Sequence, residues 1–248
     1  GILCHDGSPF TAEDVKFTWE FCTNPESTAT TLGTYVTVES VDIIDDYTVR
    51  LNFTEAKPDW WDPFRGGNGQ VLAEHVYRDY IGAASRDAPA NLMQIGTGPY
   101  KVTQFNPGDT VLYEMFEDYW DPGLPFFDEI EIKGGGDAVS AARAVLQTGD
   151  ADWAWNLQVE PEILQQLMSG GAGELDVVLG TGGTERLMIN FMDHRVEVDG
   201  ARAELGNPHP WFYDQRVRKA LDLSCPRDII ATELYGEAGG FATANNFD

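Results

Sequence analysis

The hydrophobic residues that follow position 10 repeat with the spacing of an amphipathic helix. Apolar side chains recur four positions apart between Val15 and Phe21, which places a wide apolar stripe on one face. Thr11 can accept a hydrogen bond from the first backbone N–H groups, and Asp14, three positions later, can accept one from Thr11. Phe10 can pack on Val15 as a hydrophobic staple. The pattern predicts a helix that begins directly after Thr11.

Three further stretches of the first half have the two-residue period of β-strands. The alternation over 35–53 is interrupted at 45–46, and that over 98–116 is interrupted at 106–109, where Asn, Pro, Gly and Asp favour a turn. Both stretches predict hairpins. Residues 126–133 predict a third, shorter strand.

The second half of the chain alternates predicted helices with short apolar strands. Asp137 can cap a helix that Gly149 ends. The other predicted elements are a strand over 152–157, a helix over 160–171 with Pro161 in its first turn, strands over 174–180 and 185–191, and two helices over 214–236 that are broken around Ser224-Cys225-Pro226. Helices and hairpins in this mixture predict a mixed α/β (α+β) fold.

The charge of the chain restricts its partners. Its 248 residues include 16 Lys and Arg against 41 Asp and Glu, which gives a net charge of −25. Phosphate groups and anionic membrane surfaces bind clustered cations, so we expect no nucleic-acid partner and no membrane surface. No apolar run approaches the roughly 18 residues of a membrane span, so no direct membrane insertion is predicted. No signal peptide is visible, and any targeting segment is expected to lie outside this sequence.

Residues that catalyse reactions or bind metals are scattered. The four histidines are widely spaced along the chain, and no metal site is predicted. The glycine run 134–136 precedes a helix start but lacks the spacing and the Lys-Ser/Thr of a phosphate loop, and no cofactor is predicted. No nucleophile motif is present, so no catalytic residue is predicted. Of the three cysteines, only Cys4 and Cys22 lie close enough in sequence to be candidates for a disulfide.

Adjacent tryptophans at 60 and 61 are a candidate ligand-contacting feature. In an extended segment, neighbouring side chains point to opposite faces, so one ring is partly exposed or faces a groove. The glycine-rich stretch 65–70 that follows suits a loop whose backbone approaches another group closely. Packing of both rings in the protein interior is the competing interpretation.

A second candidate is the stretch TGDADWAWNLQ, residues 148–158. Strand alternation would place Trp153, Trp155 and Leu157 on one face and the amides of Asn156 and Gln158 on the other. Trp153 is then predicted to lie in the core, and Trp155 either in the core or on the wall of a cleft. The amides would find hydrogen-bond partners if their face opened onto a cleft.

Four stretches of the chain resemble motifs of the extracellular solute-binding proteins of family 5, which serve ABC importers of peptides, nickel and related solutes. They are CHDGSPFTAEDVKFTWEF, GTGPYKVTQFNPGDTVLYEMFEDYWD, AARAVLQTGDADWAW and DQRVRKALDLSCPRDIIATELYGEAG. All four occur in the family's order and span nearly the whole chain, which makes the resemblance specific. The chain departs from the pattern at Ser224-Cys225-Pro226, where the family usually has an Ala-Ile-Asp type of sequence, and at Cys4, where it often has an aromatic or apolar residue.

The resemblance implies periplasmic-binding-protein type II-like lobes with a small accessory domain, truncated at both ends because family members are longer. Residues 1–95 would belong to the accessory domain, 96–190 to the first ligand-binding lobe, and 191–248 to the start of the second lobe.

The resemblance also implies a non-catalytic function, the capture of a peptide or similar small solute between two lobes for an ABC permease. The protein would then be periplasmic or extracellular, with a cell-surface lipoprotein as one form it could take. The family tends to place ligand contacts directly after its L-x-x-G-x-x-D strand, which implies a solute site at Trp155, Asn156, Leu157 and Gln158, with weaker candidates at Thr30, Thr31, Gly67, Asn68 and Gln70. The alternatives are an oligosaccharide-binding member of the family, a hydrolytic enzyme that uses paired carboxylates, and a structural or adhesive surface domain.

Overall fold

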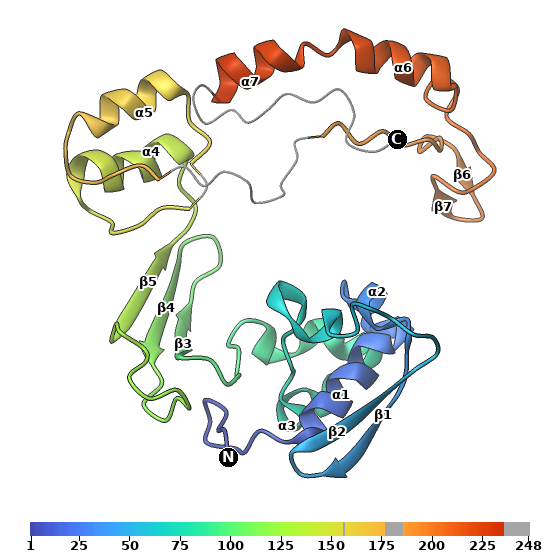
Figure 1. Ribbon diagram of the computed structural model, residues 1–248, viewed down its shortest axis with the longest axis vertical. Helices are drawn as coiled ribbons and strands as arrows, with labels where there is room; N and C mark the ends of the chain where they lie inside the picture. The colour runs from blue at the N-terminus through green and yellow to red at the C-terminus, as the bar shows by residue number, and fades with distance from the viewer. Residues whose placement is uncertain (156, 177–185, 236–248) are drawn as a thin grey trace. The chain divides into compact units, whose positions relative to one another are not determined.

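Figure 1 shows the computed structural model, which describes residues 1–155, 157–176 and 186–235. The chain forms two compact units, Gly1–Gly135 and Gly136–Asp248. Helices and antiparallel sheets occur together, so the predicted mixed α/β class is confirmed. The division into segments 1–95, 96–190 and 191–248 stays a prediction. None of the described helices combines the length and the apolarity that crossing a membrane requires.

Helix α1 (Ala12–Thr23) begins with the predicted capping box. Thr11 Oγ1 accepts from the Glu13 N–H at 3.3 Å, and Asp14 Oδ2 accepts from the Thr11 N–H at 2.7 Å. The other oxygen of Asp14 accepts from the N–H of Glu74, the first residue of α3 (Glu74–Tyr77), at 2.8 Å. One buried carboxylate therefore starts α1 and fixes α3 against it.

The two sides of α1 pack into two hydrophobic clusters. Phe17 lies with Tyr77 in one cluster, and Cys22 lies with Tyr35 in the other. The predicted hairpin covers the second cluster as β1 (Val38–Asp45) and β2 (Thr48–Phe53), which pair antiparallel. The first hairpin prediction is thus confirmed.

Short helical turns complete the packing around α1. Tyr35, the last residue of α2 (Leu32–Tyr35), donates from its hydroxyl to the Pro63 carbonyl at 3.2 Å and meets the Phe64 ring edge-on. The 3-10 turns are Pro25–Ser27, Asp62–Phe64, Gly66–Asn68, Arg78–Tyr80, Gly82–Asp87 and Pro89–Asn91.

A three-stranded antiparallel sheet completes the first unit, with β4 (Thr110–Met115) between β3 (Tyr100–Phe105) and β5 (Glu129–Lys133). This confirms the predicted second hairpin and third strand.

His5 joins the N-terminal segment to the start of this sheet. Its backbone N–H donates to the Gly96 carbonyl at 2.9 Å, and its Nδ1 accepts from the Gly96 N–H at 3.3 Å. The other ring nitrogen, Nε2, must then carry the proton and donates to the Gly98 carbonyl at 3.0 Å. The ring also packs edge-on against Phe116, with centroids 5.2 Å apart.

The second unit begins with two packed helices. Asp137 caps α4 (Ala138–Arg143) by accepting from the Ser140 N–H at 2.8 Å, and a π-helical turn (Ala144–Thr148) continues to Gly149, whose φ of 71° ends it. The predicted cap and stop are confirmed, as is the helix that follows, α5 (Pro161–Met168). The core between these helices consists of the side chains of Ala142, Leu146, Val159 and Leu167.

The rest of the second unit contains a short two-stranded sheet, β6 (Glu197–Val198) and β7 (Ala201–Arg202), and two helices. The predicted helix pair is confirmed as α6 (Gln215–Ser224) and α7 (Arg227–Tyr235), interrupted at Cys225-Pro226.

Two strand predictions in this unit are wrong for the residues that the structure describes. Neither 152–157, apart from Asn156, nor 186–191 is a strand. A strand exists only when a neighbour satisfies its backbone groups, and within the described part of the chain no strand pairs with either stretch. The third stretch, 174–180, lies largely outside the described residues.

We expect Asp14→Ala to lower the free energy of unfolding of the first unit by about 2–4 kcal/mol, because the N–H groups of Thr11 and Glu74 lose their acceptor. Urea unfolding followed by circular dichroism measures this. Glu13→Ala, at an exposed neighbouring position, is the matched control and should change stability much less. Equal losses in both variants would contradict the role given to Asp14.

The three cysteines are free, and Cys4 and Cys22 are buried whereas Cys225 is half-buried. Burial, aided by the Asp14 and Asp6 carboxylates, raises the pKa of the Cys4 thiol from 9.0 to about 11. Burial also raises the pKa of Cys22. Since the thiolate is the reactive form, we expect Cys225 to react first with a thiol reagent at pH 8, and Cys4 to gain reactivity only toward pH 11.

Mass spectrometry of the labelled peptides measures these rates, and all three thiols should react at similar rates in urea. Rapid labelling of Cys4 in the native protein at pH 8 would contradict the assignment.

Candidate functional site

Two neighbouring tryptophans are exposed on irregular backbone after Gly149. Trp153 is 70% exposed and Trp155 is 77% exposed. Their ring centroids lie 5.8 Å apart with the planes inclined by 34°. The predicted core position of Trp153 is therefore wrong. Large aromatic rings that lie together and are exposed to water are typical of binding surfaces.

The segment that carries the two rings is held at both ends. At its start, Thr148 Oγ1 donates to Asp150 Oδ2 at 2.7 Å, and the Ala151 N–H donates to the Ala144 carbonyl at 3.3 Å. At its other end, Leu157 packs against the core between α4 and α5, and Val159 is buried in it. These aliphatic side chains fill the core in place of the indoles.

Of the four residues predicted after the L-x-x-G-x-x-D stretch, three lie within the described residues. Trp155 and Gln158 are exposed, whereas Leu157 is half-buried against the core cluster. Asn156 lies outside the described residues. Their contact with a solute stays a prediction.

The weaker candidates all lie in the first unit. Thr30 is exposed, and Thr31 is half-buried and donates from Oγ1 to Cys22 Sγ at 3.5 Å. Gly67 and Asn68 are exposed in the 3-10 turn Gly66–Asn68, and Gln70 is exposed just after it. The contacts of Tyr35 with Pro63 and Phe64 place α2 beside the adjoining 3-10 turn (Asp62–Phe64), so these candidates come from neighbouring segments.

The paired tryptophans at 60 and 61 lie directly before the 3-10 turns of the same unit. Their rings meet edge-on at 5.8 Å, and they are 51% and 42% exposed. The sequence-based inference that at least one ring is partly exposed is confirmed, and both are.

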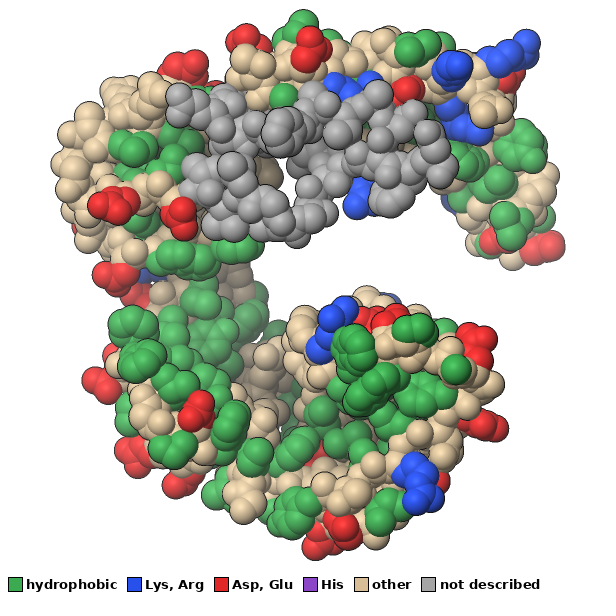
Figure 2. Space-filling view, in the orientation of Figure 1, with side chains coloured by type: hydrophobic (Ala, Val, Ile, Leu, Met, Phe, Trp, Pro, Cys, Tyr) green, Lys and Arg blue, Asp and Glu red, His purple; other side chains and the backbone are tan. Residues whose placement is uncertain are grey.

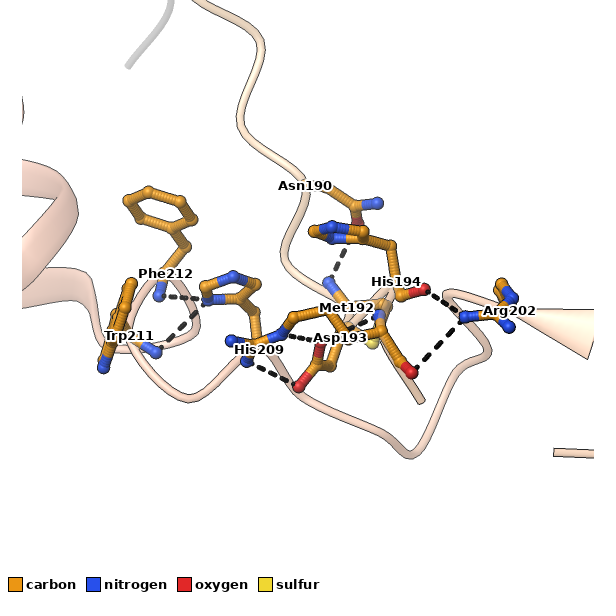
Figure 3. Close-up of polar contacts among 9 residues, drawn as sticks. Asn190, Met192, Asp193, His194, Arg202, His209, Trp211 and Phe212 are labelled. Carbon is orange, nitrogen blue, oxygen red and sulfur yellow. Dashed lines mark hydrogen bonds and ion pairs between the residues drawn. The ribbon is translucent and has the colours of Figure 1, made fainter. Parts of the chain in front are cut away.

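The sequence interpretation missed a cluster of polar contacts in the second unit (Figure 3). Asp193 is buried and accepts from Nε and Nη2 of Arg195, both at 2.8 Å. These charged hydrogen bonds, with one from the Arg195 backbone N–H, hold the pKa of the Asp193 carboxyl well below its usual range. Arg202 donates to the carbonyls of His194 and Arg195 and so ties β7 to the same loop.

His209 is the buried centre of this cluster, with an exposure of 6%. Its Nδ1 accepts from the backbone N–H groups of Trp211 and Phe212 at 3.3 and 3.2 Å, as Figure 3 shows. Its ring stacks on Phe212 with centroids 4.7 Å apart. His209 lies between Pro208 and Pro210, and these contacts give it a structural role in the loop.

The cluster orients the entry to α6. Asp214 caps that helix by accepting from the Arg216 N–H at 2.8 Å, and its contacts with the Arg216 side chain lower its pKa to about 2. Arg218 donates to the carbonyls of Phe212 and Tyr213. Because these polar groups bond to one another, the arrangement stabilises the loop. Among the described residues, no group of three or more His, Cys, Asp or Glu is placed to hold a metal ion.

The model of the family described as "Bacterial extracellular solute-binding proteins, family 5 Middle" matches residues 1–247. The chain is 30% identical over 169 residues to the glutathione-binding protein GsiB of Pectobacterium atrosepticum, covering 64% of this chain and 30% of that protein. It is 26% identical to a putative ABC transporter peptide-binding protein of Brucella ovis, covering 94% of this chain and 40% of that protein. The chain thus spans less than half the length of these relatives.

Solved structures show the same fold. The Agrobacterium tumefaciens R10 protein MoaA, in complex with mannopinic acid, aligns with a TM-score of 0.71 at 21% identity over 94% of this chain and 42% of its own. The oligopeptide-binding protein AppA of Bacillus subtilis, in complex with a nonapeptide, aligns with a TM-score of 0.53 at 28% identity over 60% of this chain and 29% of its own. The predicted lobes of a periplasmic-binding-protein type are confirmed at the level of fold.

We expect His209→Leu to lower the free energy of unfolding by about 1–3 kcal/mol, because the N–H groups of Trp211 and Phe212 lose their acceptor in a buried position. Chemical unfolding followed by near-ultraviolet circular dichroism measures this. His194→Leu, at an exposed position whose ring lies 6.4 Å from that of His209, is the matched control and should leave stability nearly unchanged. A larger loss of stability in His194→Leu than in His209→Leu would contradict the structural role given to His209.

Proposed function

The chain belongs to family 5 of the bacterial extracellular solute-binding proteins, and we propose that it is part of the substrate-binding component of an ABC importer. In this proposal the whole protein captures a peptide or similar small solute between two lobes and delivers it to a membrane permease. It works in the periplasm or outside the cell, with a cell-surface lipoprotein as one form it could take. Members of the family are binding proteins of transporters, which disfavours the hydrolytic alternative.

The observation that carries the proposal is the exposed pair of Trp153 and Trp155. Two indoles at 5.8 Å present a broad apolar surface, and they follow a turn anchored by hydrogen bonds of Thr148 and Ala151. Such a platform can cover the side chains of a bound solute, while neighbouring polar groups such as Gln158 fix its orientation.

A peptide is the favoured solute class. Support comes from the relatives named for binding glutathione and peptides, and from the Bacillus subtilis protein in complex with a nonapeptide. Tryptophan faces also stack on sugar rings, so oligosaccharides are the second class to test.

The solute class is tested by thermal unfolding of the full-length parent protein with tripeptide mixtures, glutathione, oligosaccharides and Ni(II)-histidine, each in a separate series. A solute that binds the native state raises the melting temperature, and we expect the peptide series to do so. A shift with oligosaccharides alone would replace the peptide proposal. Turnover of a substrate without any shift would overturn the binding-protein proposal.

We expect Trp155→Ala to weaken solute binding at least about tenfold, because an exposed indole that a ligand covers contributes more than about 1.4 kcal/mol. Isothermal calorimetry with the solute that gives the largest shift measures this. Phe126→Ala, which removes an equally exposed aromatic ring from the first unit, is the matched control and should bind the solute normally.

Asn156→Ala should also weaken solute binding with little loss of stability. Loss of stability with solute binding intact would contradict that expectation.

A further inference from the structure

A second aromatic surface lies in the first unit, and it shares no residue with the proposed solute site. The connection between β4 and β5 folds over the start of β3 and forms an open groove of about 300 Å³. Apolar side chains line it, among them Tyr100, Tyr119, Leu124, Phe126, Phe127 and Ile130. Figure 2 shows hydrophobic side chains gathered over this sheet, with carboxylates beside them.

The groove exposes more aromatic surface than folding requires. Phe126 is 83% exposed and Phe127 is 67% exposed, and Trp120, whose ring lies 5.5 Å from that of the lining residue Tyr119, is 55% exposed. Contiguous apolar surface of this kind mostly marks an interaction site.

Hydrogen bonds hold the connection in this conformation. The Phe127 N–H donates to the Tyr100 hydroxyl at 3.2 Å, and the Tyr119 N–H donates to the Phe116 carbonyl at 3.0 Å. The Met115 N–H donates to the Asp128 carbonyl at 2.8 Å. The two phenyl rings are therefore presented by a fixed backbone, which lowers the entropic cost of binding a partner.

The connection between β4 and β5 carries charges of a single sign. Five carboxylates lie in this connection and at the start of β5, and none of them forms an ion pair with any described residue: Glu117, Asp118, Asp121, Asp128 and Glu129. No Lys or Arg occurs between Lys101 and Lys133. Uncompensated carboxylates beside exposed rings complement a partner that is both apolar and cationic.

We infer that this groove is a docking surface for a segment of a partner protein that carries apolar side chains next to Arg or Lys. The apolar side chains would cover Phe126 and Phe127, the guanidinium or ammonium groups would lie over the ring of Trp120, and the carboxylates would pair with them. The partner is a protein segment because nucleic acid and anionic lipid would be repelled by the same carboxylates.

Fluorescence anisotropy of the full chain with two labelled peptides tests the inference. One peptide alternates Arg with Leu and Pro, and the other has Glu in place of every Arg. We expect the Arg peptide to bind, with an affinity that falls as salt rises, and the Glu peptide to bind at least about tenfold more weakly. Equal binding of the two peptides, or no binding of the Arg peptide at millimolar concentration, overturns the inference.

Variants then locate the bound peptide. Phe126→Ser/Phe127→Ser should weaken the Arg peptide at least about tenfold, and Asp118→Asn/Asp121→Asn should weaken it and flatten its salt dependence. Glu39→Gln/Glu55→Gln removes two exposed carboxylates near the β1–β2 hairpin and is the matched control for charge. Melting temperatures of all variants report whether the fold is retained. If the Ser pair does not fold, unchanged binding and salt dependence in the Asn pair overturn the inference.

Trp155→Ala separates this inference from the proposed solute site. The Arg peptide should bind this variant normally. Loss of binding in Trp155→Ala with retention in Phe126→Ser/Phe127→Ser would place the peptide at the solute site and overturn the docking surface.

Discussion

The buried carboxylate of Asp14 is the contact on which the first unit depends. It accepts from the N–H of Thr11 and from the N–H of Glu74, sixty residues further along the chain. Four residues later, the Thr18 hydroxyl donates to the Asp14 carbonyl and accepts from the Leu72 N–H at 2.8 Å. These bonds fix the position of α1 against the segment that supplies Tyr77, and the two hydrophobic clusters form on either side of the helix.

Local chemistry made much of this fold predictable. A helix cap requires only a few consecutive residues, so the starts at Thr11 and Asp137 and the stop at Gly149 followed from the sequence. Hairpins are nearly as local, because the turn determines which residues pair. The failures at 152–157 and 186–191 have the opposite cause: apolar alternation suits a strand, but a strand also needs a neighbouring chain segment, which periodicity does not reveal.

The geometry of the candidate site could not be predicted from the sequence. Resemblance to the family pointed to Trp155 and the residues after it, whereas the strand interpretation buried Trp153, because alternation alone does not show how large the adjoining core is. That core is small and is filled by Leu157 and Val159. For the cluster around His209, the only local indication in the sequence is the pair of flanking prolines. Its hydrogen bonds could not be predicted, because they form only when the loop has folded.

The contacts of His5 have a consequence for the order in which this protein acquires its structure. The fifth residue of this chain leaves the ribosome well before the groups that bond to its backbone and ring, which belong to Gly96 and Gly98. More than ninety further residues must be synthesised before His5 can form these hydrogen bonds. Bringing such distant groups together costs loop-closure entropy, and the chain bears this cost late in folding. During translation, α1 and the first hairpin can therefore form while the N-terminal segment around His5 still lacks its hydrogen-bond partners.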